Sequence, residues 1–277
     1  MEKKRKIGIE QLAVTAVMLA ASTLLSLLKI IDLPYGGSVT MASLLPIVIV
    51  AIRYGTPWGL LTGLTHGLIQ FALGASVLGW VTGWVSIVTV ILLDYVVAFA
   101  VIGLAGLARK IKNQPAAFLL GSFIACLGRY ICHFLSGVTV WRDISIPGDA
   151  AVIYSLIYNA TYMLPELLVL LVVAYYISSA LDFRAAKLVA LRKTDLSLPA
   201  KILSIIAGAI LAFAAVFDIV SIFSVLQNEE TGEFAFTQLS EVNWPVVIAV
   251  TVICIVFAAA IFIAKHFINR NAAKKAQ

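Results

Sequence analysis

The sequence predicts an all-α polytopic membrane protein with eight membrane-spanning segments. Of its 277 residues, 62% are hydrophobic and 12% are charged, and the mean hydropathy is +1.03. Soluble domains contain about 45–50% apolar and about 25% charged residues, so an ordinary soluble protein is excluded, and so is a disordered one. Several apolar runs reach the roughly 20 residues that a spanning helix needs. Such runs must be helical because backbone polar groups cannot stay unpaired in lipid.

The first segment follows four basic residues, Lys3 to Lys6, and is long enough to span a bilayer. A secretory signal peptide has an apolar core of only about 7–15 residues, so we interpret this segment as a retained helix. The second is short and contains Pro46, and prolines at 57, 115, 199 and 245 open other segments, where a first-turn proline is tolerated. The eight predicted segments are 9–31, 40–54, 57–74, 80–108, 115–137, 151–180, 200–226 and 244–267.

The basic residues predict that both termini are cytoplasmic. With the N-terminus inside, 17 of the 20 Lys and Arg residues fall on the cytoplasmic side, as the positive-inside rule requires. The net charge of +6 is therefore interpreted as membrane orientation, not as nucleic-acid binding. Tryptophans gather near the predicted outer interface, at positions 80, 84, 141 and 244.

Three parts follow from this pattern. Residues 1–182 form a six-helix membrane domain, residues 183–199 a basic cytoplasmic linker on the inner leaflet, and residues 200–277 two additional transmembrane helices with a basic tail. Gly55, just before the third segment, and Gly59, Gly63 and Gly67 within it recur every four residues. This spacing predicts a helix face without side chains, against which another helix packs closely.

Ionisable residues at membrane depth are functional candidates because burying them is costly. They are His66, Asp94, Arg129, His133, Glu166 and Asp218. Arg129 and His133 share one face of the fifth segment, and with Asp94, Tyr154 and Asn159 they fall in the outer half of the bundle, near Trp141. A carboxylate among aromatic rings suits a cationic heteroaromatic ligand.

Structural roles remain open for several of these residues. Asp94 and Arg129 are also placed to form an ion pair between two helices, and His66 to form a hydrogen bond across a helix contact. Glu166 follows Pro165, and we expect it to satisfy backbone groups that the proline frees; Asp218 is expected to face a partner helix or to reach outward.

Motifs for catalysis and cofactor binding are absent from the sequence. It contains no G-x-x-x-x-G-K-[ST] phosphate loop, no G-x-S-x-G, no H-E-x-x-H and no Cys/His metal spacing. Its three cysteines lie within apolar runs. We therefore expect no catalytic residues, no metal, no cofactor and no enzymatic activity.

Two stretches carry a family resemblance, GRYICHFLSGVTVW at 128–141 and AVIYSLIYNAT at 151–161, supported by RYGTPWGLLTGLTHG at 53–67 and LDYVVAFAVIGLAG at 93–106. Across roughly residues 8–182, the chain resembles the thiamine-specific substrate-binding S components of energy-coupling factor (ECF) transporters. The resemblance implies a six-helix membrane protein that captures thiamine from outside with high affinity. It also implies energising partners, namely a transmembrane coupling protein and two ATPase subunits.

The resemblance also implies site residues. The ligand carboxylate matches Asp94, and its other ligand-binding positions match Tyr95, His133, Gly137, Trp141, Tyr154 and Asn159, while Ala16 and Ala20 match the face that contacts the coupling protein. The family's carboxylate is Glu where this chain has Asp94, a tryptophan of the first outer loop is replaced near Gly36–Gly37, and another aromatic position is taken by His66.

Two other functions remain open. A self-sufficient secondary transporter of a small cationic or heteroaromatic metabolite would use Asp94, Arg129 and Glu166 as an ion relay. A membrane-embedded enzyme would use His133 and Asp94 as acid and base, and would need a nucleophile or metal site that the sequence does not reveal.

Overall fold

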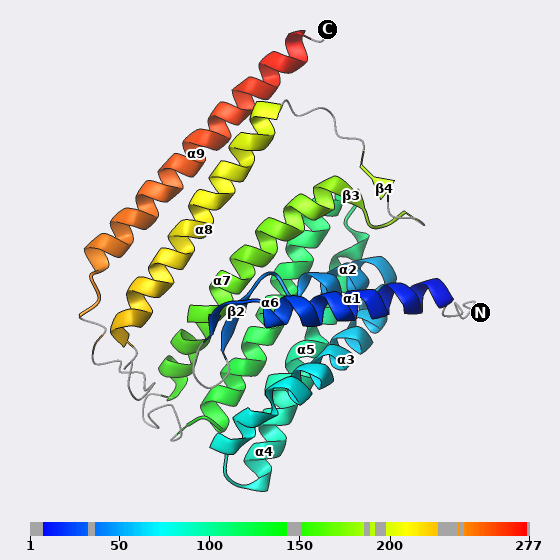
Figure 1. Ribbon diagram of the computed structural model, residues 1–277, viewed down its shortest axis with the longest axis vertical. Coiled ribbons are helices and arrows are strands. Elements are labelled where there is room, and N and C mark those ends of the chain that lie inside the picture. The colour runs from blue at the N-terminus through cyan, green and yellow to red at the C-terminus, as the bar shows by residue number, and fades with distance from the viewer. Residues whose placement is uncertain are drawn as a thin grey trace. The chain divides into compact units, whose positions relative to one another are not determined.

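A computed structural model describes residues 8–32, 37–142, 151–185, 189–191, 198–226, 238 and 241–275. Within these residues, seven helical segments are long and apolar enough to cross a membrane, and one further apolar helix is shorter. The prediction of an all-α polytopic membrane protein is thereby confirmed. The chain divides into two compact units, Met1–Ala190 and Leu191–Gln277 (Figure 1).

The first unit contains the six predicted segments. It begins with α1 (Ile9–Leu27), strands β1 (Lys29–Asp32) and β2 (Ser38–Thr40), α2 (Leu45–Tyr54), α3 (Thr56–Gly74) and the 3-10 helix η2 (Ala75–Trp80). The fourth span runs through α4 (Trp84–Val90), the π-helix η3 (Ile91–Val97), α5 (Ala98–Ala100) and the 3-10 helix η4 (Val101–Lys110). It ends with α6 (Gln114–Thr139), α7 (Ala151–Ala180) and the paired strands β3 (Leu181–Asp182) and β4 (Val189–Ala190).

The first helix is shorter than the sequence predicted. It ends at Leu27, and residues 29–32 form β1, which pairs antiparallel with β2 and joins Lys29 to Thr40 and Asp32 to Ser38. The predicted helix to residue 31 is therefore wrong at its C-terminal end. In the hairpin the two strands satisfy each other's backbone groups, so this stretch needs no helix to pair them.

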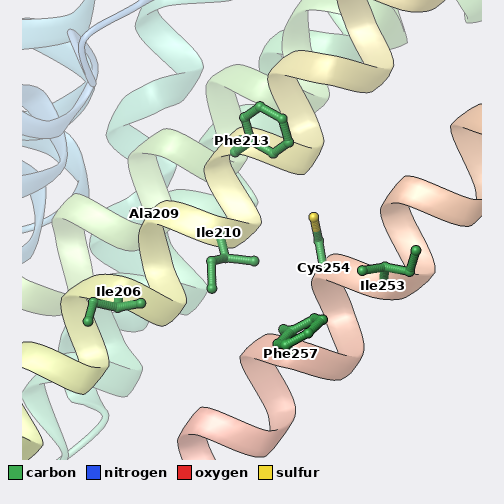
Figure 2. Close-up of a pocket in the computed structure, with 7 residues that line it drawn as sticks. All are labelled: Ile206, Ala209, Ile210, Phe213, Ile253, Cys254 and Phe257. Carbon is green, nitrogen blue, oxygen red and sulfur yellow. The ribbon is translucent and has the colours of Figure 1, made fainter.

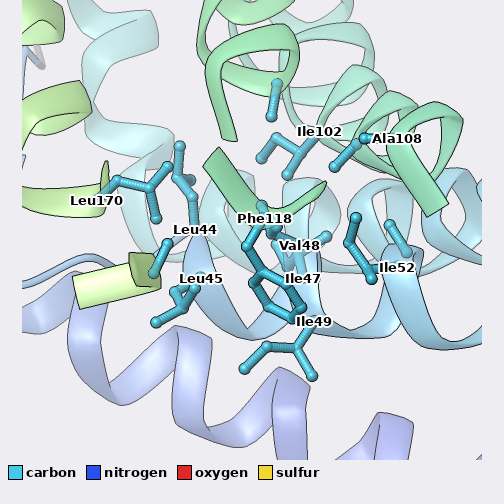
Figure 3. Packing of buried hydrophobic residues seen from close by; sticks show 14 of the residues in the cluster. Leu44, Leu45, Ile47, Val48, Ile49, Ile52, Ile102, Ala108, Phe118 and Leu170 are labelled. Carbon is cyan, nitrogen blue, oxygen red and sulfur yellow. The ribbon is translucent and has the colours of Figure 1, made fainter. Parts of the chain in front are cut away.

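The short helix α2 forms the centre of the first unit. Its ten residues are about 15 Å long, too short to cross a bilayer core of about 30 Å, and every residue from Leu45 to Ile52 is buried. An all-round apolar helix is stable only when other helices cover it. Figure 3 shows Ile47, Val48 and Ile52 packed together with Ile102 of η4 and Phe118 of α6.

Three of the four glycines, Gly59, Gly63 and Gly67, form the predicted face on α3 against which the fourth span packs closely. A side chain at Gly63 would overlap the carbonyl oxygen of Phe99, and a Cβ at Gly67 would lie 2.5 Å from the carbonyl oxygen of Tyr95. Gly59 lies against Ala51 of α2 and Gly103 of η4. Gly55 has a different role: it ends α2 with φ of 101°, a conformation that favours glycine.

The second unit is a pair of helices, α8 (Leu198–Leu226) and α9 (Trp244–Lys275), packed side by side (Figure 1). Asp218 of α8 accepts a hydrogen bond from the Thr251 hydroxyl of α9 at 2.7 Å, so it faces a partner helix, one of the two positions we expected. An apolar groove lies between the helices, lined by Ile206, Ala209, Ile210, Phe213, Ile253, Cys254 and Phe257 (Figure 2).

Candidate functional site

Asp94 lies in the π-helical segment η3, inside the fourth membrane span. π-Helical turns are rare and occur frequently at functional sites. The Asp94 side chain is only 14% exposed. A carboxylate in this position needs hydrogen-bond donors, because burying an unpaired charge is costly.

Three side chains supply those donors: His133 and Ser136 near the C-terminal end of α6, and Trp141 just after it. His133 Nδ1 lies 2.9 Å from Asp94 Oδ1. The Ser136 hydroxyl donates to Oδ2 at 2.7 Å, and Trp141 Nε1 donates to Oδ2 at 3.3 Å. The structure therefore brings Asp94, His133 and Trp141 together. Gly137, buried one turn beyond His133, adds no side chain to this face of α6.

Ser136 was not singled out from the sequence. The only signal was its position three residues after His133, which places both on one helix face. Small hydroxyl residues are common in membrane helices, so the spacing alone does not separate Ser136 from a packing residue. Its contact with Asp94 does.

The second ring nitrogen of His133 has no hydrogen-bond partner among the described residues. Asp94 as a carboxylate only accepts hydrogen bonds, so Nδ1 of His133 carries the hydrogen in their contact. In a neutral ring, Nε2 is then a bare acceptor. Nε2 is buried, and the described residues offer it no hydrogen-bond partner. An unpaired buried polar atom costs about 1–3 kcal/mol, so this nitrogen is placed to accept a hydrogen bond from a ligand.

Tyrosines line one face of α7, and one of them, Tyr162, contacts the His133 ring. Tyr154 is buried and stacks on Tyr158, with ring centroids 6.4 Å apart. Tyr162 presents its ring to His133 at 6.4 Å and donates from its hydroxyl to Asn159 Oδ1 at 2.6 Å. The four-residue spacing of these three tyrosines gives one aromatic face. Tyr162 was missed from the sequence, although this spacing was the signal that could have found it.

Arg129 lies one turn before His133 on α6, and its guanidinium carbon is 4.7 Å from the centroid of the Phe99 ring. Among the described residues no hydrogen bond or ion pair holds the guanidinium, and its Nε is buried without a partner. The ion pair with Asp94 that the sequence left open is therefore absent from the described structure. The contact with Phe99 is a cation–π interaction.

His66 of α3 lies on the same Phe99 ring, with ring centroids 5.2 Å apart. It is 0% exposed. Its Nε2 is 3.3 Å from the Ser22 hydroxyl of α1, which is the hydrogen bond across a helix contact that the sequence left open. Its Nδ1 has no partner in the described structure. His66 and Arg129 thus meet at Phe99 and do not touch Asp94.

Tyr95 does not join the Asp94 cluster. Its hydroxyl donates to the Gly74 carbonyl at 3.1 Å, and its ring lies edge-on to Phe71. The side chain next to Asp94 in sequence therefore packs against the end of α3. Its contacts in this structure are those of a helix-packing residue.

Glu166 bonds to the hairpin and not to the backbone around Pro165. Its side chain is 1% exposed, and it accepts hydrogen bonds from the backbone N–H of Thr40 and from the Thr40 hydroxyl, the latter at 2.7 Å. The expectation that it satisfies groups freed by Pro165 is wrong. The reason is that β2, which the sequence did not reveal, brings two donors to the carboxylate.

Some predicted features fall outside the described residues: Lys3 to Lys6, Gly36 of the first outer loop, and most of the linker 183–199. Within the described residues, no group of three His, Cys, Asp or Glu side chains is placed to hold a metal ion. On α1, Ala16 and Ala20 are exposed on one face together with Ala13.

Comparisons with known proteins place the chain in a family. The sequence model of the thiamine transporter protein family matches residues 12–184. The thiamine transporter ThiT of Bacillus subtilis (strain 168) is 34% identical over 170 residues, which is 57% of this chain and 84% of that protein. A solved structure of ThiT from Listeria monocytogenes has the same fold, with a TM-score of 0.51 at 22% identity, covering 61% of this chain and 93% of that one. The chain therefore belongs to the thiamine transporter protein family.

Proposed function

We propose that the chain is the thiamine-binding S component of an ECF-type vitamin transporter. The observation that carries the proposal is that His133 and Trp141 both contact the carboxylate of Asp94. Membership in a family of thiamine transporters supports the choice of ligand.

The groups at the site match those of thiamine. Its thiazolium ring carries a positive charge, which the carboxylate of Asp94 balances. The amino group on its pyrimidine ring has N–H donors, and His133 Nε2 offers a free acceptor. The flat rings stack on aromatic side chains such as Tyr154 and Trp141.

The proposed orientation puts both termini in the cytoplasm and the site near the outer surface. In the first unit, Arg53 and Arg184 meet at the end where α7 finishes: Arg53 donates to the Phe183 carbonyl at 2.7 Å, and Arg184 to the Ile111 carbonyl at 2.6 Å. This basic end is the cytoplasmic one under the positive-inside rule. The site lies toward the opposite end of α6, so we propose that its ligand enters from outside.

Energy is proposed to come from separate proteins. The sequence contains no phosphate-binding loop of the P-loop type, so ATP hydrolysis is assigned to two ATPase subunits. The exposed face of α1 with Ala16 and Ala20 is the proposed contact for the transmembrane coupling protein. Small residues allow a partner helix to approach closely in the bilayer.

The test is a titration of the purified full chain with thiamine while tryptophan fluorescence is followed. We expect quenching with a Kd in the nanomolar to low micromolar range, because Trp141 lies at the site. A panel of other vitamins should give no quenching in that range. Absence of quenching by thiamine would overturn the proposal. In liposomes, uptake driven by an ion gradient alone would support the secondary transporter instead.

A further inference from the structure

We infer that the turn between η4 and α6 binds the headgroup of an anionic phospholipid. Arg109, Lys110 and Lys112 supply the positive charge for the phosphate. The inference goes beyond the proposed function, because it concerns the lipid around the protein and not the ligand that the protein carries.

The turn lies at the depth of lipid headgroups. Only three residues, 111–113, separate the spanning segments Trp84–Lys110 and Gln114–Thr139. The helix α6 has 26 residues and is about 39 Å long, close to the roughly 40–45 Å of a bilayer with its headgroups. The side chains of the turn are therefore held at the membrane surface, next to phosphate groups.

Arg184 leaves the cations of the turn available for a ligand. Its guanidinium donates to the carbonyl oxygens of Arg109 at 3.2 Å, Ile111 at 2.6 Å and Lys112 at 3.0 Å. Basic side chains near the end of a helix can bond to its last carbonyls, but here Arg184 already occupies them. The side chains of Arg109, Lys110 and Lys112 are exposed, and no described residue accepts a hydrogen bond from them.

Acidic side chains do not neutralise the turn. Among the described residues of the first unit, Glu10 and Asp182 are the acids at this end. Glu10 pairs with Arg53 at 3.6 Å, and Asp182 accepts from the backbone N–H groups of Arg184 and Ala185. The turn therefore keeps an uncompensated positive charge. In the proposed orientation it faces the cytoplasmic leaflet, whose anionic lipids attract basic segments next to a membrane span.

Apolar side chains beside the turn favour a lipid over a soluble anion. Leu107 of η4 is 62% exposed, and Leu120 of α6 is 45% exposed. Both lie inside the two spans that the turn connects, at a depth where hydrocarbon chains surround the protein. A phospholipid presents a phosphate and acyl chains together, whereas a free phosphate or an acidic protein surface presents only the charge.

The experiment measures lipid binding to the full chain in detergent by native mass spectrometry. The probes are dioctanoyl phosphatidylglycerol, which is anionic, and dioctanoyl phosphatidylcholine, which has no net charge. Wild type should bind phosphatidylglycerol at least tenfold more tightly, equivalent to about 1.4 kcal/mol. Lys110→Gln and Lys112→Gln should each weaken phosphatidylglycerol about fivefold, and the double variant at least tenfold, while phosphatidylcholine changes less than twofold. Lys265→Gln is the matched control: it removes the same charge from the end of another span, Trp244–Lys265, and should change both affinities less than twofold.

Equal affinity of wild type for the two lipids would overturn the inference. Equal weakening by Lys265→Gln would overturn it too, because it would show attraction to positive charge in general. Displacement of phosphatidylglycerol by an equal concentration of glycerol 3-phosphate would assign the turn to a soluble anion instead. Both lysines are exposed, so the variants should unfold at the wild-type temperature and bind thiamine as wild type does. If wild type binds no thiamine, the proposed function fails, and the comparison of lipids still decides this inference.

Discussion

Replacing Asp94 by Asn tests the charge of the site while keeping the size of the side chain. The carboxylate accepts from Ser136 and Trp141 on one oxygen and from His133 on the other. If the amide nitrogen took the place of Oδ2, it would face the Trp141 N–H, which can only donate. The amide must therefore turn its oxygen to Trp141 and its nitrogen to His133, whose ring then accepts on Nδ1 and carries its hydrogen on Nε2.

The substitution thus removes two features that the ligand needs. It takes away the negative charge beside the cation, and it converts His133 Nε2 from an acceptor into a donor. A hydrogen bond or contact that involves a charged group contributes about 1.5–3 kcal/mol. Since about 1.4 kcal/mol is a tenfold change, we expect Asp94→Asn to weaken thiamine binding by roughly 10- to 150-fold.

The assay is a fluorescence titration with two ligands. One is thiamine and the other is an uncharged isostere in which carbon replaces the thiazolium nitrogen. Thermal unfolding in detergent checks that the variant is folded. We expect the loss to be at least fivefold larger for thiamine than for the isostere, because only thiamine loses a charge partner. A folded Asp94→Asn variant that binds thiamine within twofold of wild type would refute the reasoning.

Four further predictions follow from other contacts. His133→Ala should weaken thiamine binding at least tenfold in the same titration, since it removes the free acceptor; unchanged affinity would remove His133 from the site. Gly63→Ala should lower the unfolding temperature through overpacking of about 1–3 kcal/mol, because its Cβ would overlap the Phe99 carbonyl, whereas Gly79→Ala, with open space around it, should not. Ala16→Leu should leave thiamine affinity intact but abolish uptake by cells that contain the coupling module; normal uptake would contradict the proposed docking face. Glu166→Gln should lower the unfolding temperature, since it sets an amide against the two donors of Thr40; a loss of affinity like that of Asp94→Asn would contradict its structural role.

The spans of the fold could be predicted from the sequence because lipid imposes a simple rule on composition. The exceptions are features that the apolar composition of a segment does not determine. After Leu27, β1 and β2 replace the end of the first predicted helix, since a hairpin also pairs the backbone. The change to π-helix at residues 91–97 leaves the apolar composition of the span unaltered, so hydropathy carries no sign of it.

The candidate site was predictable to the extent that residue type and depth restrict the choice. Asp94 and His133 stand out because ionisable residues are rare in membrane segments. Ser136 and Tyr162 do not stand out, since hydroxyl and aromatic side chains are common there. What distinguishes them is a tertiary contact, Ser136 with Asp94 and Tyr162 with the His133 ring. Spacing along one helix shows which residues share a face, but not which residues of another helix they contact.

Glu166 and Asp94, two carboxylates inside the described part of the first unit, have different roles. Glu166 is 1% exposed, and Thr40 supplies both donors from a backbone and a hydroxyl group, so the hairpin is bound to α7. Asp94 is 14% exposed, and its donors come from α6 and the residues that follow it. The partners of Asp94 are not themselves saturated, because His133 keeps a free acceptor. A closed carboxylate stabilises a fold, whereas a carboxylate whose partners retain unused hydrogen-bonding capacity is prepared for a ligand that completes the network.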